Sequence, residues 1–150
     1  MLERKSNSRA RVLVVDDQLS MAETLADGLT ECGYEAVALS SSQLAAERLA
    51  AHESFDALVT DLRMPGLDGL ELLKISLAAS PERPVVVMTA FSAVESVVES
   101  LRQGAFHCLS KPFRLEELVL FLNRALEGVV LRRDAVALQS ALLEKDANEG

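Results

Sequence analysis

Charged and polar side chains directly follow several of the short apolar runs in this sequence. They are two adjacent aspartates, a third aspartate, a threonine and a lysine: Asp16, Asp17, Asp61, Thr89 and Lys111. Carboxylates held close together repel one another, so a site built from three of them must be shared with a cation. Oxygen ligands with room left for water are typical of Mg²⁺. The set therefore predicts a site that holds Mg²⁺ and a phosphoryl group beside a carboxylate nucleophile.

The elements that must position these side chains can be recognised from the spacing of apolar residues. Apolar runs rich in Val, Leu and Ala occur at 12–15, 36–39, 57–60, 85–88 and 105–109. Between them, apolar residues recur every three or four positions, which is the helical period. Strands that alternate with helices predict a doubly wound α/β domain with a parallel sheet and helices on both faces. Ligands bind such sheets at the carboxyl ends of the strands, where all five side chains are expected.

Capping and turn residues agree with this alternation. Gly33 is expected to end the first helix, and one of the serines at 40–42 is expected to cap the second. Ser92 and Glu95 have the spacing of a capping box for the fourth helix. These signals place the helix boundaries close to the limits of the apolar periodicity.

The last helical segment continues beyond the point where a compact domain would end. Apolar residues recur there every seven positions, a period typical of coiled coils, at Leu122, Val129, Val136 and Leu143. Residues 127–150 are either a helical extension or linker, possibly coiled, or a frayed tail. We expect a flexible segment at 1–10 and one domain at 11–126.

Four motifs in this order resemble the receiver domain of two-component response regulators. They are VLVVDD at 12–17, DLRMPGLDG at 61–69, MTA at 88–90 and LSKPF at 109–113. The resemblance covers residues 11 to about 125. It implies a flavodoxin-like fold whose five parallel strands have the order 2-1-3-4-5.

The resemblance also implies a role for each residue of the acidic site. Asp61 would accept the phosphoryl group, and Asp17 would bind Mg²⁺ directly. Asp16 would hold the metal ion through water, and the main-chain carbonyl of Arg63 would complete its coordination. The domain would catalyse its own phosphorylation and dephosphorylation, as a regulatory switch rather than a turnover enzyme.

The switch residues follow from the same resemblance. Thr89 and Lys111 would engage the phosphoryl oxygens, with Ala90 small enough to leave them space. The peptide bond that precedes Pro112 would be cis. Receivers usually carry Tyr or Phe three positions before the lysine, a ring that moves inward on activation. This chain has Cys108 there, so its switch must work without that ring.

Taken singly, these residues also have ordinary structural explanations. Asp16 and Asp17 could cap a helix, Asp61 could form a turn before Pro65, and Lys111 could be a solvated charge. Their coincidence at strand ends on one edge of the sheet favours a functional site. A nucleotide-binding module is less well supported, because the sequence has no glycine-rich phosphate loop. A phosphatase with an aspartyl intermediate is disfavoured because no D-x-D-x-T motif follows the first run.

Composition excludes several other classes of protein. The 150 residues are 49% hydrophobic and fit one globular domain, without an apolar run long enough to cross a membrane. The net charge of −8 is the wrong sign for this chain to bind DNA by itself. The two cysteines, Cys32 and Cys108, have neither a disulfide framework nor metal spacing. With no secretory signal recognisable, a cytoplasmic protein is expected.

The resemblance is greatest to receivers of NtrC-type transcriptional regulators. The segments that carry it are DLRMPGLDGLELL, GAFHCLSKPF and the long last helix. This implies a histidine kinase or phosphotransfer protein as phosphoryl donor and a transcription-regulating output. Alternatives are a stand-alone regulator and an interaction module that is never phosphorylated. A homodimer is expected through the segment 91–126 or through the heptad residues of the last helix.

Overall fold

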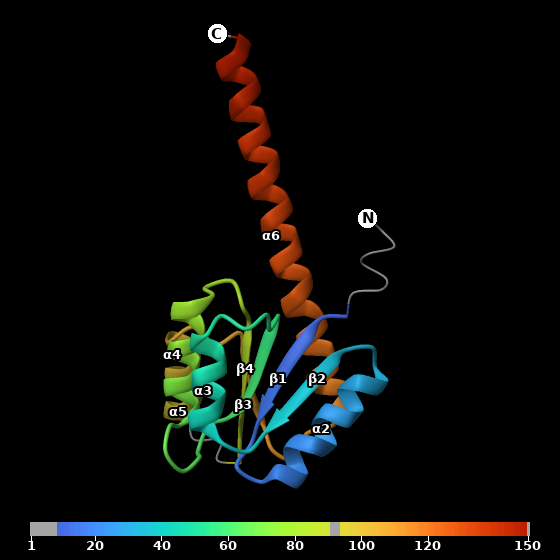
Figure 1. Ribbon diagram of the computed structural model, residues 1–150, viewed down its shortest axis with the longest axis vertical. Coiled ribbons are helices and arrows are strands. Elements are labelled where there is room, and N and C mark those ends of the chain that lie inside the picture. Colours follow the sequence, from blue (N-terminus) through green and yellow to red (C-terminus); the bar gives the residue numbers. More distant parts are fainter. Residues whose placement is uncertain (1–8, 91–93, 150) are drawn as a thin grey trace.

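The computed structural model describes residues 9–90 and 94–149, with side chains up to residue 143. These residues contain one sheet of five parallel strands, in the order β2-β1-β3-β4-β5. The strands are β1 (Arg11–Val15), β2 (Glu35–Leu39), β3 (Ala57–Asp61), β4 (Val85–Thr89) and β5 (His107–Ser110). This confirms the predicted doubly wound α/β fold and its strand order (Figure 1).

Helices cover both faces of the sheet and pack into two separate cores. They are α2 (Leu19–Glu31), α3 (Ser42–Ala50), α4 (Gly69–Ala79), α5 (Val94–Arg102) and α6 (Leu115–Glu149). One core joins the sheet to α2 and the first half of α6, and the other joins it to α3 and α4. In Figure 1, α5 lies on the same side as α3 and α4.

The central strands β1, β3 and β4 have the near-continuous apolar sequences of strands buried on both faces. In β1, Val12 and Val14 enter the core beside α2, whereas Leu13 and Val15 enter the core beside α3. The strand ends are fixed by this packing on both faces. The residues that follow them are therefore held on a rigid support.

Most of the predicted capping residues occupy the expected places. Ser41 caps α3 by accepting a hydrogen bond from the main-chain N–H of Leu44, and Gly33 follows α2 with a φ of 102°. The expected capping box at Ser92 falls on residues 91–93, outside the described residues. Most of the segment at 1–10 likewise lies outside them.

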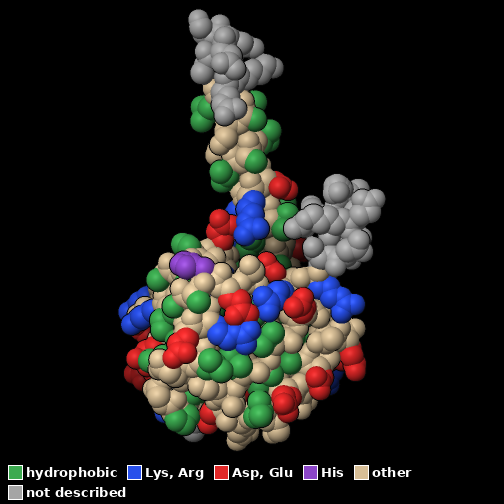
Figure 2. Space-filling view, in the orientation of Figure 1, with side chains coloured by type: hydrophobic (Ala, Val, Ile, Leu, Met, Phe, Trp, Pro, Cys, Tyr) green, Lys and Arg blue, Asp and Glu red, His purple; other side chains and the backbone are tan. Residues whose placement is uncertain are grey.

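Helix α6 is 35 residues long and leaves the domain as a straight stalk (Figure 1). The stalk carries exposed apolar side chains, which Figure 2 shows in green between the domain and the grey end of the helix. Val136 and Leu143 are 61% and 70% exposed. Leu122 and Val129 are 0% and 6% exposed because they pack against the domain, so the expectation that they form part of a pairing surface is wrong. Among the described residues, no helix is both long and apolar enough to cross a membrane.

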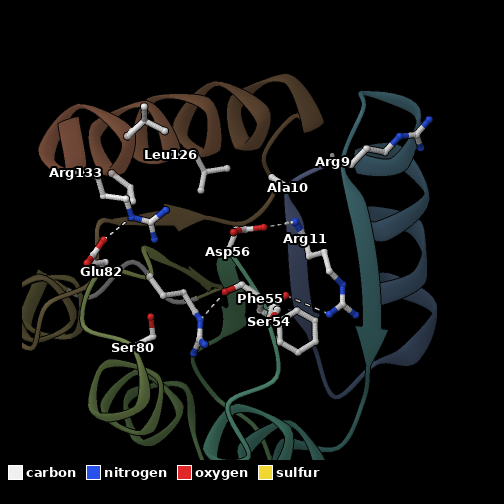
Figure 3. A pocket seen from close by; sticks show the side chains of 13 residues that line it. Arg9, Ala10, Arg11, Ser54, Phe55, Asp56, Ser80, Glu82, Leu126 and Arg133 are labelled. Carbon is white, nitrogen blue, oxygen red and sulfur yellow. Dashed lines mark hydrogen bonds and ion pairs between the residues drawn. The ribbon is translucent and has the colours of Figure 1, made fainter. Parts of the chain in front are cut away.

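Side chains at the amino-terminal edge of the sheet hold the base of this stalk. Arg133 of α6 forms an ion pair with Glu82 at 2.7 Å, beside a cavity of about 470 Å³ (Figure 3). In the same view, the Asp56 carboxylate accepts a hydrogen bond from the main-chain N–H of Arg11 at 2.8 Å. Arg133 of α6 thus contacts the domain at the edge of the sheet opposite to the one that carries Asp61.

Candidate functional site

The carboxyl edge of the sheet brings the three predicted aspartates together. Asp16 follows β1 directly, Asp61 is the last residue of the neighbouring β3, and Val15 pairs with Thr60 in the register between them. Asp16, Asp17 and Asp61 each offer a carboxylate oxygen, and these oxygens lie within 4.8 Å of one another. This confirms that the three carboxylates form one cluster.

Lys111 lies across two of these carboxylates. Its ammonium nitrogen is 2.8 Å from Asp16 Oδ2 and 3.4 Å from Asp61 Oδ2. Both aspartates are largely buried, and a buried carboxylate without a partner would be strongly destabilising. Lys111 therefore balances part of the negative charge of the cluster.

Burial and neighbouring charges shift the acidity of these groups. Burial raises the pKa of the Asp61 carboxyl, an effect that Lys111 opposes and the charge of Asp16 reinforces. Burial lowers the pKa of Lys111, but the hydrogen bond to Asp16 and the charges of Asp61 and Asp16 outweigh it, so the net shift is upward. The lysine is therefore held in its charged form, which can bind an anion.

Asp16 is fixed at both of its carboxylate oxygens. Oδ1 accepts a hydrogen bond from the main-chain N–H of Gln18 at 2.9 Å, while Oδ2 binds Lys111. Gln18, not an aspartate, is the N-cap residue of α2, and its side chain makes no capping bond. The two aspartates are thus not the helix cap, and Asp17 is exposed at the rim of the cluster.

Thr89 ends β4 and Lys111 directly follows the neighbouring β5, at the same edge of the sheet. Thr89 ends β4 with 1% exposure, and its carbonyl accepts a hydrogen bond from the Lys111 N–H at 2.8 Å. The Lys111–Pro112 bond is cis, as the resemblance implied. Ala90 is exposed and lines a cavity of about 360 Å³ together with Met21, Leu25, Lys111, Pro112 and Phe113. The structure thus places Lys111 against the acidic cluster, with Thr89 at the end of β4 on the same edge of the sheet.

The segment from Asp61 to α4 is packed tightly where it leaves the sheet. Asp61 Oδ1 accepts a hydrogen bond from the Leu62 N–H at 2.8 Å. A Cβ atom on Gly69 would lie 2.5 Å from the Asp61 carbonyl oxygen. This distance is too short for any residue with a side chain, so the position requires glycine. Asp68 and Glu71 form a capping box that starts α4 at this point. Sequence reasoning missed this box, although the D-x-x-E spacing could have revealed it.

A family model for the response regulator receiver domain matches residues 12–123 of the chain. The chain belongs to the response regulator receiver family. It is 42% identical over 115 residues to the response regulator protein FleR of Pseudomonas aeruginosa, a match that covers 77% of this chain and 24% of FleR. It is 39% identical over 118 residues to the DNA-binding transcriptional regulator NtrC of Escherichia coli, covering 79% of this chain and 25% of NtrC. The receiver therefore spans about a quarter of the length of these relatives.

Solved structures of receivers have the same fold. The beryllofluoride-activated receiver domain of NtrC4, solved as a dimer, is 32% identical with a TM-score of 0.74, covering 79% of this chain and 98% of that one. NtrX from Brucella abortus, solved in complex with ATP, is 32% identical with a TM-score of 0.78, covering 87% of this chain and 30% of NtrX. These relatives place the receiver among those of NtrC-type regulators.

Cys108 occupies the position at which receivers usually carry an aromatic ring. It lies on β5 opposite Val87, half-buried, and packs against the core beside α3 and α4. Burial raises the pKa of its thiol, which disfavours the reactive thiolate form. On the other face of β5, the ring of His107 stacks on Phe121 of α6 with 3.7 Å between centroids. That stack joins β5 to α6, and sequence reasoning did not find it.

Proposed function

We propose that this receiver is a phosphorylation-dependent switch that accepts a phosphoryl group on Asp61 from a histidine kinase or a phosphotransfer protein. The observation that carries the proposal is the cluster of three carboxylates with Lys111 lying across it. Asp61 is the carboxylate that sits at the end of a central strand with a charged lysine 3.4 Å away. A carboxylate in this position can act as a nucleophile toward phosphorus while the lysine receives the negative oxygens.

The donor set of the cluster fits Mg²⁺. Asp16, Asp17 and Asp61 would hold the ion, and the Arg63 carbonyl would complete its coordination as the resemblance implies. The ligands are all oxygens, and the exposed position of Asp17 leaves an open side for water and a phosphoryl oxygen. When bound, the ion would neutralise charge on the carboxylates and on the transferred group.

The chemical step transfers one phosphoryl group from a histidine nitrogen to a carboxylate oxygen. A carboxylate oxygen of Asp61 attacks phosphorus, the P–N bond of the phosphohistidine breaks, and its electron pair stays on the imidazole nitrogen. Lys111 and Thr89 would hold the phosphoryl oxygens, while Ala90 leaves room for them. Hydrolysis of the acyl phosphate by water would reset the switch.

We expect an acyl phosphate to phosphorylate the wild-type protein without a kinase, because the receiver itself orients the reacting groups and supplies the metal site. Incubation with acetyl phosphate and Mg²⁺ should raise the intact mass by one phosphoryl group, and chelation of Mg²⁺ with EDTA should prevent this. If the mass does not rise under any condition, the chain is an interaction module that is not phosphorylated, and the proposal is wrong.

The output of the switch is proposed from the relatives and from exposed apolar surface. FleR is named as a response regulator and NtrC as a transcriptional regulator, so a transcription-regulating output is the one we propose here. We also propose a cytoplasmic location, which is typical of receiver domains. Apolar side chains are exposed on α5, before β5 and on α6, and we call them together the α5 surface: Val94, Val98, Leu101, Phe106 and Leu120. Along the chain, α5 is the next helix after Thr89 and α6 is the next helix after Lys111, so a phosphoryl group held by these two residues could alter the position of both helices.

We expect phosphorylation to change self-association through this α5 surface or through the stalk of α6. Light scattering with and without Mg²⁺ and beryllofluoride measures the change. Val98→Asp tests the α5 surface, and Val136→Asp tests the stalk, since both side chains are exposed. Truncation after Asp134 removes most of the stalk but keeps Val129 and Arg133, which anchor α6 to the domain. A monomer at every concentration in both states would contradict the proposed homodimer.

A further inference from the structure

Ser42, the first residue of α3, is buried against the segment that follows Asp61. Its side chain is almost enclosed, at 5% exposure. The hydroxyl donates a hydrogen bond to the carbonyl of Pro65 and accepts one from the N–H of Leu67, each at 3.1 Å. One side chain thus satisfies two main-chain groups in a segment that is far away in the sequence.

These two bonds close the turn around Gly66. The turn has a φ of 78° at this glycine, and a Cβ atom there would lie 3.4 Å from the Ser42 hydroxyl. The segment is also fixed at its ends, where the Leu62 N–H binds Asp61 and the Gly69 N–H binds the Leu62 carbonyl at 2.7 Å. Ser42 is therefore the contact from α3 that holds the middle of the segment.

We propose that Ser42 is a positioning residue for the phosphorylation site, acting through the turn at 65–67 on the segment that carries the Arg63 carbonyl. The proposal rests on the proposed function, because it matters only if Asp61 accepts a phosphoryl group with Mg²⁺ bound. Ser42 does not touch the reacting atoms. It fixes the main chain two residues after Arg63, and the position of that main chain decides whether a carbonyl can face the ion.

The physical reason is the cost of leaving two main-chain groups without partners. Without the hydroxyl, the Pro65 carbonyl and the Leu67 N–H must find water or move. A moved turn shifts the Arg63 carbonyl with it. Residues that orient the ligands of a metal ion typically change metal affinity or activity by roughly 10- to 100-fold when they are removed.

The adjacent serine provides a matched control. The Ser41 hydroxyl caps α3 through the Leu44 N–H and not through the turn, so Ser41→Ala weakens the start of the same helix. We expect Ser42→Ala to weaken Mg²⁺ binding and to slow phosphorylation by acetyl phosphate by roughly tenfold. Ser41→Ala should leave both unchanged in the folded protein. Mg²⁺ affinity is measured by the shifts of the amide signals of residues 62–64 and 66–68 in the full chain.

The outcomes separate the proposal from the function on which it rests. Ser42→Gly removes the same hydroxyl together with the β-carbon and must reproduce the effect of Ser42→Ala. If the wild type is phosphorylated and both Ser42 variants bind Mg²⁺ and react as it does, the role of Ser42 is overturned and the switch stands. Equal losses in the Ser41 and Ser42 variants would also overturn it, because the effect would come from the helix. A wild type that is never phosphorylated overturns both.

Discussion

Asp61→Asn is expected to eliminate phosphorylation of this receiver. The amide that replaces the carboxylate is a poor nucleophile toward phosphorus, and the structure shows Asp61 as the carboxylate at the end of β3 that faces Lys111. After incubation with acetyl phosphate and Mg²⁺, the intact mass of the variant should show no added phosphoryl group. The wild type treated in parallel should be modified.

Asp27→Asn is the matched control for this experiment. Asp27 is exposed on α2, so its substitution changes the net charge by the same amount without altering the cluster. It should be phosphorylated like the wild type. If Asp61→Asn gains a stable phosphoryl group at the wild-type rate, Asp61 is not the acceptor.

Asp17→Asn is expected to abolish measurable Mg²⁺ binding. Asp17 is the exposed carboxylate of the cluster, and the resemblance assigns it direct contact with the ion. Mg²⁺ prefers anionic oxygen ligands, so a neutral amide in this place removes a large share of the attraction. Because Asp17 is exposed, the substitution should change the free energy of unfolding little. Titration calorimetry of wild type and variant with Mg²⁺ measures the difference.

Asp27→Asn again distinguishes loss of a ligand from loss of general negative charge. It should bind Mg²⁺ with the wild-type affinity, since exposed charges beyond the cluster are screened by salt. An unchanged Mg²⁺ affinity in Asp17→Asn would show that Asp17 is not a ligand of the metal ion. Phosphorylation of that variant should fall together with Mg²⁺ binding.

The fold could be predicted because the apolar runs, the helical period and the capping residues all indicate the same strands and helices. The apolar runs of β1, β3 and β4 are continuous, as burial on both faces requires, and the segments between them have the helical period. The serines at 40–42 and Gly33 marked helix boundaries where the structure has them. The strand order came from the resemblance, because spacing along the chain cannot establish which strands are neighbours.

The acidic cluster was predictable for the same reason that it forms. Asp16 follows β1 and Asp61 ends β3, and parallel strands end at one edge of a sheet. The bonds of Ser42 could not be predicted, since nothing in the spacing shows that the start of α3 meets the turn after Asp61. The heptad pattern was misleading at Leu122 and Val129, because apolar periodicity does not distinguish a domain core from a surface that pairs with a second chain.

The location of the phosphoryl group in wild-type protein tests the central claim most directly. The protein is incubated with acetyl phosphate, in Mg²⁺ or in EDTA, and any acyl phosphate is then reduced with borohydride and located by peptide mass spectrometry. We expect modification at Asp61 alone, and only with Mg²⁺. Modification at another acidic residue, or equal modification of Asp61 in EDTA, would contradict the proposed switch.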